Sequence, residues 1–210
     1  MSGRKKVLVA GANGTTGRTI INLLKKSEVY QPIAMVRKQD QKDHFENQGV
    51  STVLADLEEN LSQAVQNIDK VIFAAGSKGK NIIGVDQEGA KSLTDAAKLA
   101  GLEKFVMLSS MGADNPAVSD DLEDYLRAKQ NADEHLKVSG LSYSIVRPGS
   151  LTDDDGTGKI ELKEKLEKRG SISRADVAKT LVEALEDDVK QNQTFEILSG
   201  EVPIEKAVRS

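Results

Sequence analysis

Residues 5–26 read KKVLVAGANGTTGRTIINLLKK, and this stretch decides the fold of the chain. Residues 5–10 predict a short apolar strand, and residues 18–26 predict a helix. Between them, Gly11, Gly14 and Gly17 allow a tight exit from the strand, close approach of a diphosphate to the backbone, and close packing of the helix on the sheet. Free N–H groups at a helix start bind phosphate. The turn therefore predicts dinucleotide binding, and the alternative is a merely tight strand-to-helix connection. The loop residues expected to take part are Asn13, Thr15 and Thr16.

The bulk composition excludes several classes of function. The chain has 210 residues, a net charge of −4 and no cysteine. This length suits one α/β domain, and the mildly acidic charge offers no electrostatic case for nucleic acid. Cysteine nucleophiles, disulfides and thiolate zinc sites are excluded, and we predict no metal site. Without a long apolar run or an apolar leader, the chain is expected to be cytoplasmic and not membrane-bound. His44 and His135 are expected at the surface, and no G-x-S-x-G motif supports a hydrolase.

Strand and helix patterns alternate along the whole chain. This alternation predicts an α/β fold of the Rossmann type, a doubly wound parallel sheet in three layers. Gly101 and Gly140 are expected to end two helices, and Ser173 to cap another. We expect a single NAD(P)-binding domain over residues 1–210, in which residues from about 148 to 210 form a small substrate-side lobe. The further strands are predicted at 32–36, 50–55, 70–75, 104–109, 142–147 and 194–198, and the further helices at 57–66, 85–100, 121–138 and 174–185.

Cofactor choice is predicted from the end of the second strand. NAD-selective folds place an acidic residue there to bond the ribose 2′-hydroxyl, but this chain has Arg37. A guanidinium can bond a 2′-phosphate with two hydrogen bonds, and Lys38 adds a second positive charge. We therefore predict NADP, with NAD less favoured. The alternative is a solvated basic turn, and nearby Asp40 weakens the prediction slightly.

The ends of the third and fourth strands supply further candidate cofactor contacts. Asp56 can accept a hydrogen bond from the adenine amino group, and Leu57 can pack on the ring. Asp56 could equally cap the helix predicted at 57–66, and both roles could hold. Small residues after the fourth strand would let the backbone lie against the ribose and diphosphate, and these are Ala74, Ala75 and Gly76.

A serine, tyrosine and lysine set carries the candidate chemistry. Tyr125 and Lys129 are four residues apart and share one face of a predicted helix. Hydride transfer needs a proton donor or base, and a nearby ammonium favours the phenolate form of tyrosine. Ser109 or Ser110, after the fifth strand, would hold the substrate oxygen. A Tyr-x-x-x-Lys pair also arises by chance, so its place one helix after a Ser-Ser strand end is what favours catalysis.

The chain resembles the short-chain dehydrogenase/reductase superfamily. More narrowly, it is similar to the atypical branch of compact NAD(P)-binding proteins described as epimerase/dehydratases, with biliverdin IXβ reductase-like and NmrA-like relatives. The matching motifs are GANGTTG at 11–17, MVR at 35–37, LADL at 54–57, VMLSS at 106–110, YLRAK at 125–129, VRPG at 146–149 and ISRADVA at 172–178.

The resemblance implies a Rossmann fold and a set of functional residues. It implies cofactor contacts from the glycine turn, Arg37, Asp56, Leu57 and residues 74–76, and it implies that Pro148 and Gly149 border the nicotinamide. It also implies that Ser109 or Ser110, Tyr125 and Lys129 are catalytic. Lys129 is expected to touch the cofactor as well.

Two functions follow as hypotheses. The first is an NADP-dependent oxidoreductase or epimerase/dehydratase-like enzyme acting on a small carbonyl or alcohol. The second is a non-catalytic NADP(H)-binding redox sensor or regulatory protein. The expected partner is a small-molecule substrate, and the chain is expected to be a monomer or small homo-oligomer. Residues 153–155 are expected to form a solvated turn, with a polar substrate or metal contact as the alternative.

Overall fold

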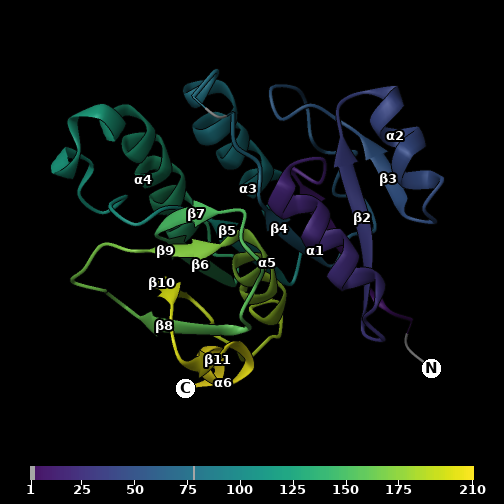
Figure 1. Ribbon diagram of the computed structural model, residues 1–210. Helices are drawn as coiled ribbons and strands as arrows, with labels where there is room; N and C mark the ends of the chain where they lie inside the picture. The colour runs from purple at the N-terminus through teal and green to yellow at the C-terminus, as the bar shows by residue number, and fades with distance from the viewer. Residues whose placement is uncertain (1–2, 78) are drawn as a thin grey trace.

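The computed structural model describes residues 3–77 and 79–210. Its centre is a nine-stranded sheet with the order β11-β8-β10-β6-β5-β4-β1-β2-β3 (Figure 1). Two short strands, β7 (Ser150–Thr152) and β9 (Ser171–Ser173), pair with each other in a separate parallel ribbon. The strands of the main sheet are β1 (Lys5–Ala10), β2 (Tyr30–Val36), β3 (Ser51–Leu54), β4 (Lys70–Phe73), β5 (Lys104–Leu108), β6 (Tyr143–Pro148), β8 (Lys159–Lys163), β10 (Gln193–Ser199) and β11 (Val202–Pro203).

The central strands are parallel, and their order reverses beside β1. All pairings from β3 through β2, β1, β4, β5 and β6 to β10 are parallel, whereas β8 and β11 pair antiparallel at one edge. From β1 the chain continues to β2 and β3 on one side, and from β3 it crosses over to β4 on the other side of β1. Such a reversal opens a crevice at the carboxyl ends of the strands. The predicted Rossmann-type doubly wound sheet is therefore confirmed.

Helices cover both faces of this sheet. On one face lie α1 (Thr15–Lys25), α5 (Arg174–Glu183) and α6 (Ile204–Arg209). On the other lie α3 (Ala90–Leu99) and α4 (Glu123–Val138), preceded by the π-helix η1 (Ile82–Gly89). The helix α2 (Gln39–Glu46) packs beside β3 and β2, and the 3₁₀ turns η2 (Pro116–Val118) and η3 (Asp120–Leu122) pack against α4.

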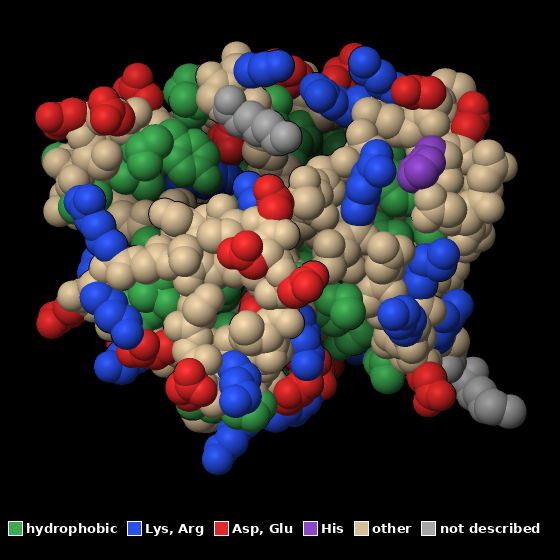
Figure 2. Space-filling view, viewed as in Figure 1, with side chains coloured by type: hydrophobic (Ala, Val, Ile, Leu, Met, Phe, Trp, Pro, Cys, Tyr) green, Lys and Arg blue, Asp and Glu red, His purple; other side chains and the backbone are tan. Residues whose placement is uncertain are grey.

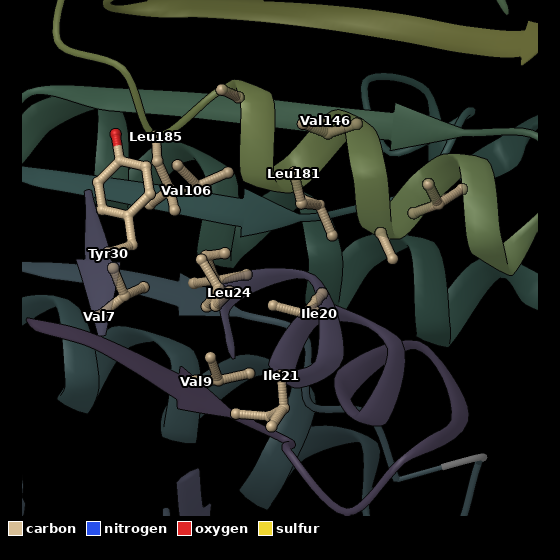
Figure 3. Packing of buried hydrophobic residues seen from close by; sticks show 14 of the residues in the cluster. Val7, Val9, Ile20, Ile21, Leu24, Tyr30, Val106, Val146, Leu181 and Leu185 are labelled. Atoms are coloured by element: carbon tan, nitrogen blue, oxygen red, sulfur yellow. The ribbon is translucent and has the colours of Figure 1, made fainter. Parts of the chain in front are cut away.

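The core is divided between these two faces because strand residues alternate in direction. Val7 and Val9 of β1 pack with α1 and α5, and Leu8 of the same strand packs on the opposite side. Figure 3 shows Ile20 and Leu24 of α1 together with Leu181 of α5 around the strand residues of this first core. The first core thus fixes the start of α1, and with it the glycine-rich turn, against the sheet.

One predicted helix is wrong. Residues 57–66 form turns, although Leu57, Leu61, Ala64 and Val65 are buried at spacings that suggested a helix. The Asp56 carboxylate accepts a hydrogen bond from Glu58 N, and in the same way the Asn60 side chain accepts one from Ser62 N. Such side-chain bonds give the backbone an alternative to helical pairing. The apolar residues reach the second core from turns.

Other local predictions are confirmed or extended. Ser173 caps α5 by accepting a hydrogen bond from Asp176 N. Gly101 and Gly140 adopt positive φ angles of 71° and 86° after α3 and α4. The helix expected at 85–100 is π-helical up to Gly89 and becomes α3 at Ala90. The sequence patterns did not predict α2, α6, β7, β8, β9 or β11. Among the described residues, no helix is long and apolar enough to cross a membrane.

Two lysines are buried at the amino ends of β4 and β5. Lys70 Nζ donates to Leu185 O at 2.6 Å and pairs with Asp187. Lys104 Nζ donates to Glu186 O at 2.5 Å and to Val189 O at 2.7 Å. These ammonium groups bind carbonyls in the turn that follows α5. The pKa of Lys104 is lowered to about 8, mainly because its ammonium group is buried and to a smaller extent because the Lys70 ammonium repels it.

This depressed pKa predicts a rise of stability at alkaline pH. Between about pH 8 and 10.5 the unfolded chain holds a proton on Lys104 that the folded chain has lost, so the free energy of unfolding rises with pH. Relative to that of Lys104→Met, the free energy of unfolding of the wild type should rise by roughly 2 kcal/mol between pH 8 and pH 10. Urea unfolding of both proteins at several pH values measures the difference. Parallel pH profiles would show that Lys104 keeps its ordinary pKa.

Candidate functional site

A cavity of about 930 Å³ lies at the carboxyl ends of β1, β2, β4 and β5, at the topological switch point. Figure 2 shows the hollow in the upper part of the molecule, between the regions of α4 and β2. Its wall brings together most of the residues predicted for the site. The predicted residues on the wall are Gly11, Asn13, Gly14, Thr15, Thr16, Arg37, Asp56, Leu57, Ala74, Ala75, Gly76, Ser109, Tyr125 and Lys129.

The glycine-rich turn is pressed against the end of β4. Gly11 has a φ angle of 85°, and a Cβ atom there would lie 2.6 Å from Ala75 Cα. A Cβ on Gly17 would lie 2.1 Å from Gly11 O. Both positions therefore require glycine for packing of the protein itself. Gly17 packs against the backbone of the turn at Gly11 and is not part of the cavity wall.

Gly14 differs from its two neighbours in the turn. It is the N-cap of α1, and within 4 Å a Cβ atom there would meet a single group, Gly11 O at 3.3 Å. No side chain of the described residues caps α1 at this position. The first N–H groups of α1 therefore remain available beside the cavity, which is the arrangement that binds phosphate in other proteins.

Arg18 holds the turn in shape and was missed by the sequence analysis. Its Nη2 donates to Asn13 Oδ1 at 2.7 Å, and its Nε donates to Asn13 O at 3.2 Å. The guanidinium thereby fixes Asn13, which lines the cavity. The sequence feature that could have indicated this role is the position of Arg18 directly after the third glycine of the motif.

At the β2 end of the cavity, Arg37 carries an exposed guanidinium. Its Nη1 lies 3.9 Å from Asp56 Oδ2, and 57% of its side chain is accessible. Asp56 Oδ1 accepts a hydrogen bond from Glu58 N, so Asp56 closes a turn and does not cap a helix. That alternative for Asp56 is therefore wrong. Lys38 precedes α2 as its N-cap residue and stands outside the described wall.

Tyr125 and Lys129 lie on the same face of α4 and both reach the cavity. Lys129 Nζ is 5.6 Å from the centre of the Tyr125 ring and 5.9 Å from that of Phe73. It lies 3.3 Å from Asp86 Oδ1, and both side chains of this ion pair are buried. Burial disfavours the ammonium, but interactions with Tyr125 and Asp86 outweigh it, so the pKa of Lys129 is raised.

Ser109 is the serine that faces the cavity. Its Oγ donates a hydrogen bond to Asp133 Oδ2 at 2.8 Å. Asp133 Oδ2 also accepts hydrogen bonds from Arg147 Nε at 3.0 Å and from Arg147 Nη2 at 2.8 Å. Burial raises the pKa of Asp133, although Arg147 favours the charged form. Because a carboxylate paired with Arg147 only accepts, the Ser109 hydroxyl hydrogen points to Asp133 and its lone pairs remain for another donor. Ser110 instead donates to Met111 O and is outside the described wall.

Pro148 and Gly149, at the end of β6, are held in place by contacts with the neighbouring strand β10. Pro148 is buried at the end of β6. Gly149 N donates to Ile197 O, and a Cβ there would lie 2.4 Å from Leu198 Cδ2. Neither belongs to the cavity wall as described. Their motif therefore marks a close approach of β6 to β10.

Two further charged residues reach the cavity from the C-terminal part of the chain. Arg174, in the first turn of α5, pairs with Asp153 at 2.9 Å, and both line the wall. Asp153 is 77% exposed, so it is solvated and also borders the site. The sequence positions of Asp153 and Arg174 did not indicate that these two side chains pair. No group of three or more metal-ligating His, Cys, Asp or Glu side chains occurs within residues 3–77 and 79–210.

The fold and the cavity define a Rossmann-type dinucleotide-binding protein of the compact, atypical short-chain dehydrogenase/reductase kind. The NAD(P)H-binding family profile matches residues 11–188. The chain therefore belongs to the NAD(P)H-binding family. This confirms the resemblance inferred from its motifs.

Similar proteins cover almost the whole chain. A protein from Bacillus subtilis (strain 168), named as the uncharacterized sugar epimerase YhfK, is 39% identical over 213 residues, covering 97% of this chain and 99% of that protein. A Bacillus halodurans structure, named as a candidate NAD-dependent epimerase/dehydratase, is 38% identical with a TM-score of 0.93, and the match covers 97% of this chain and 98% of that chain. The oxidoreductase ylbE from Lactococcus lactis is 29% identical with a TM-score of 0.87, covering 97% and 94%.

More distant relatives carry reductase names. Sanguinarine reductase of Eschscholzia californica is 26% identical over 91% of this chain and 88% of its own length. The NAD(P)H azoreductase of Xenophilus azovorans is 27% identical over 91% of this chain and 67% of its own length. A wide-type short-chain dehydrogenase/reductase from Veillonella parvula, solved with NADP, shares the fold with a TM-score of 0.77 at 17% identity.

Proposed function

We propose that this protein is an NADP-dependent oxidoreductase that acts on a small carbonyl or alcohol through Ser109, Tyr125 and Lys129. The observation that carries the proposal is one cavity holding both the glycine-rich start of α1 and the Tyr125–Lys129 face of α4. The broader class, an NAD(P)-dependent oxidoreductase or epimerase-like enzyme, is supported by the family and by the reductase and epimerase names of its relatives.

The residues present fit a dinucleotide. Close approach at Gly14 and the uncapped first turn of α1 suit the diphosphate. The exposed Arg37 guanidinium suits a 2′-phosphate, which favours NADP over NAD. Leu57 and Asp56 would border the adenine, and Ala74 to Gly76 would lie along the ribose and diphosphate. The bound cofactor would supply or accept the hydride.

Three side chains would manage the proton and the substrate oxygen. Tyr125 would give a proton to the oxygen of a carbonyl that receives hydride, or take one from an alcohol. Lys129, held charged by its surroundings, would favour the phenolate of Tyr125 and bind the cofactor ribose. Ser109 would accept a hydrogen bond from the hydroxyl of an alcohol substrate or of Tyr125, because its own hydrogen is held by Asp133. Oxidation followed by reduction on the other face would give an epimerase by the same steps.

The first test is turnover itself. The protein, loaded with one equivalent of NADPH, is mixed with a panel of aldehydes, ketones, quinones and iminium compounds, and NADPH absorbance is followed. Oxidation by at least one compound class is expected. Tight NADPH binding with no oxidation by any compound would favour the redox-sensor function instead.

Cofactor preference gives a second prediction. Arg37→Asp should weaken NADPH binding by about 1.5–3 kcal/mol, or roughly 10- to 150-fold in Kd, because a charge-assisted bond to the 2′-phosphate is lost. NADH binding should weaken less or improve. Titration of both cofactors by fluorescence or calorimetry measures the ratio.

Lys38→Asp is the matched control for this experiment. It makes the same charge change one residue further on, outside the cavity wall, and should weaken NADPH binding much less. Equal losses in the two variants would indicate a general field effect. Tighter binding of NADH than of NADPH by the wild type would contradict the proposed preference.

A further inference from the structure

Asp86 is the most buried charged side chain on the cavity wall. It projects from η1 and is 1% exposed. Asn81 accepts a hydrogen bond from Gly84 N at the start of η1, and Gly89 lies so close to Leu57 that a Cβ there would be 2.8 Å from the Leu57 Cβ. π-Helical turns are frequent at functional sites, and this one is fixed at both ends. The carboxylate therefore has little freedom to move.

The two oxygens of Asp86 have different surroundings. Oδ2 accepts a hydrogen bond from Ser77 N at 2.9 Å, directly after the end of β4. Oδ1 is buried and accepts no well-directed hydrogen bond from the described residues, and the Lys129 ammonium lies 3.3 Å from it in an ion pair. The ion pair compensates the charge but leaves this oxygen with unused capacity to accept a hydrogen bond, which a donor on a ligand would fill.

Asp86 and Lys129 together present an acceptor beside a donor. The ammonium has three hydrogens to donate, and the carboxylate only accepts. Two neighbouring hydroxyl groups fit this pair, because one hydroxyl can give its hydrogen to Asp86 Oδ1 while an oxygen of the pair receives a hydrogen from Lys129. The wall around them includes Gly76, Ser109 and Tyr125, so the pair sits at the proposed reaction end of the cavity.

We infer that Asp86 is a cofactor-binding residue whose Oδ1, paired with Lys129, receives the diol of the nicotinamide-side ribose. The inference rests on the proposed function, because it assigns a ligand group within the same cavity. Asp86 then links three parts of the site, namely the segment after β4, the lysine of α4 and the ribose.

The inference is tested by comparing a whole cofactor with one of its halves. Asp86→Asn can keep the bond from Ser77 N through its amide oxygen, but it turns an NH₂ group toward Lys129 and the cavity. Its affinity for NADPH should fall roughly 10- to 100-fold, the loss of a hydrogen bond to a charged group. Its affinity for 2′,5′-ADP, which has no nicotinamide-side ribose, should stay within about twofold of wild type. Both ligands are titrated by calorimetry.

A control variant and a second ligand keep the result decisive. Glu88→Gln makes the same change of charge in η1 on an exposed side chain and should leave both affinities unchanged. An NADP⁺ analogue with a deoxy sugar on the nicotinamide side should bind wild type more weakly than NADP⁺ does, which tests the inference even if Asp86→Asn fails to fold.

The outcomes separate the inference from the proposed function. Equal loss of NADPH and 2′,5′-ADP in Asp86→Asn would assign Asp86 a purely structural role and overturn the inference. Unchanged NADPH affinity, or equal binding of the deoxy analogue by wild type, would also overturn it. Failure of wild type to bind NADPH at all would refute the proposed function.

Discussion

Replacing Gly14 by valine is expected to abolish binding of both NADPH and NADH while the protein stays folded. A Cβ at position 14 would meet only Gly11 O at 3.3 Å, so the protein itself tolerates a side chain there with a small adjustment. The branched side chain would instead occupy the space in which a diphosphate must approach the start of α1. Circular dichroism and cofactor titration test the two halves of this expectation.

Gly17→Val provides the contrast. A Cβ at that position would lie 2.1 Å from Gly11 O, which demands movement of the backbone. This variant should lose stability as well as binding, so the two glycines separate a ligand contact from a packing contact. If Gly14→Val folds and binds NADPH normally, the diphosphate does not lie over this turn.

Replacing Tyr125 by phenylalanine is expected to slow turnover by roughly 10²- to 10⁴-fold, the usual contribution of general acid catalysis. Only one hydroxyl is removed, and the ring keeps its place beside Lys129, so NADPH affinity should change little. The steady-state rate on a substrate found in the carbonyl panel, with cofactor Kd measured separately, gives both quantities.

Tyr143→Phe is the control for the loss of a hydroxyl. Tyr143 begins β6 and is not part of the described cavity wall, so turnover should be unchanged. Unchanged turnover in Tyr125→Phe would remove the catalytic assignment of this residue, and the search for the proton donor would then move to the remaining cavity groups.

The sequence predicts the fold well because its strongest signals are local. All seven predicted strands lie within two residues of observed ones at each end. The largest differences are at 32–36, which starts two residues too late, and at 70–75, which ends two residues too late. The weakest prediction from the sequence is the helix at 57–66, which was based on the spacing of apolar residues alone. There, short polar side chains bond to nearby backbone N–H groups and give turns that bury the same residues.

Within the site, motifs locate single residues but not their partners. The glycine spacing and the Tyr125–Lys129 spacing could be predicted because both are set by one turn or one helix face. Asp86 could not be paired with Lys129, because the contact joins η1 to α4 across the second face of the sheet.

The sequence by itself determined the Rossmann-type sheet, the glycine-rich turn at its switch point and the face of α4 that carries Tyr125 and Lys129. Only the tertiary structure decided which neighbouring serine faces the cavity, and that Asp133 holds its hydrogen. It also decided that Lys129 is paired and buried, and that Arg174 and Asp153 reach the same cavity. The physical reason is that periodicity and turn chemistry act over a few residues. The partner of a buried charge is chosen instead by whichever distant segment the packed core brings within bonding distance.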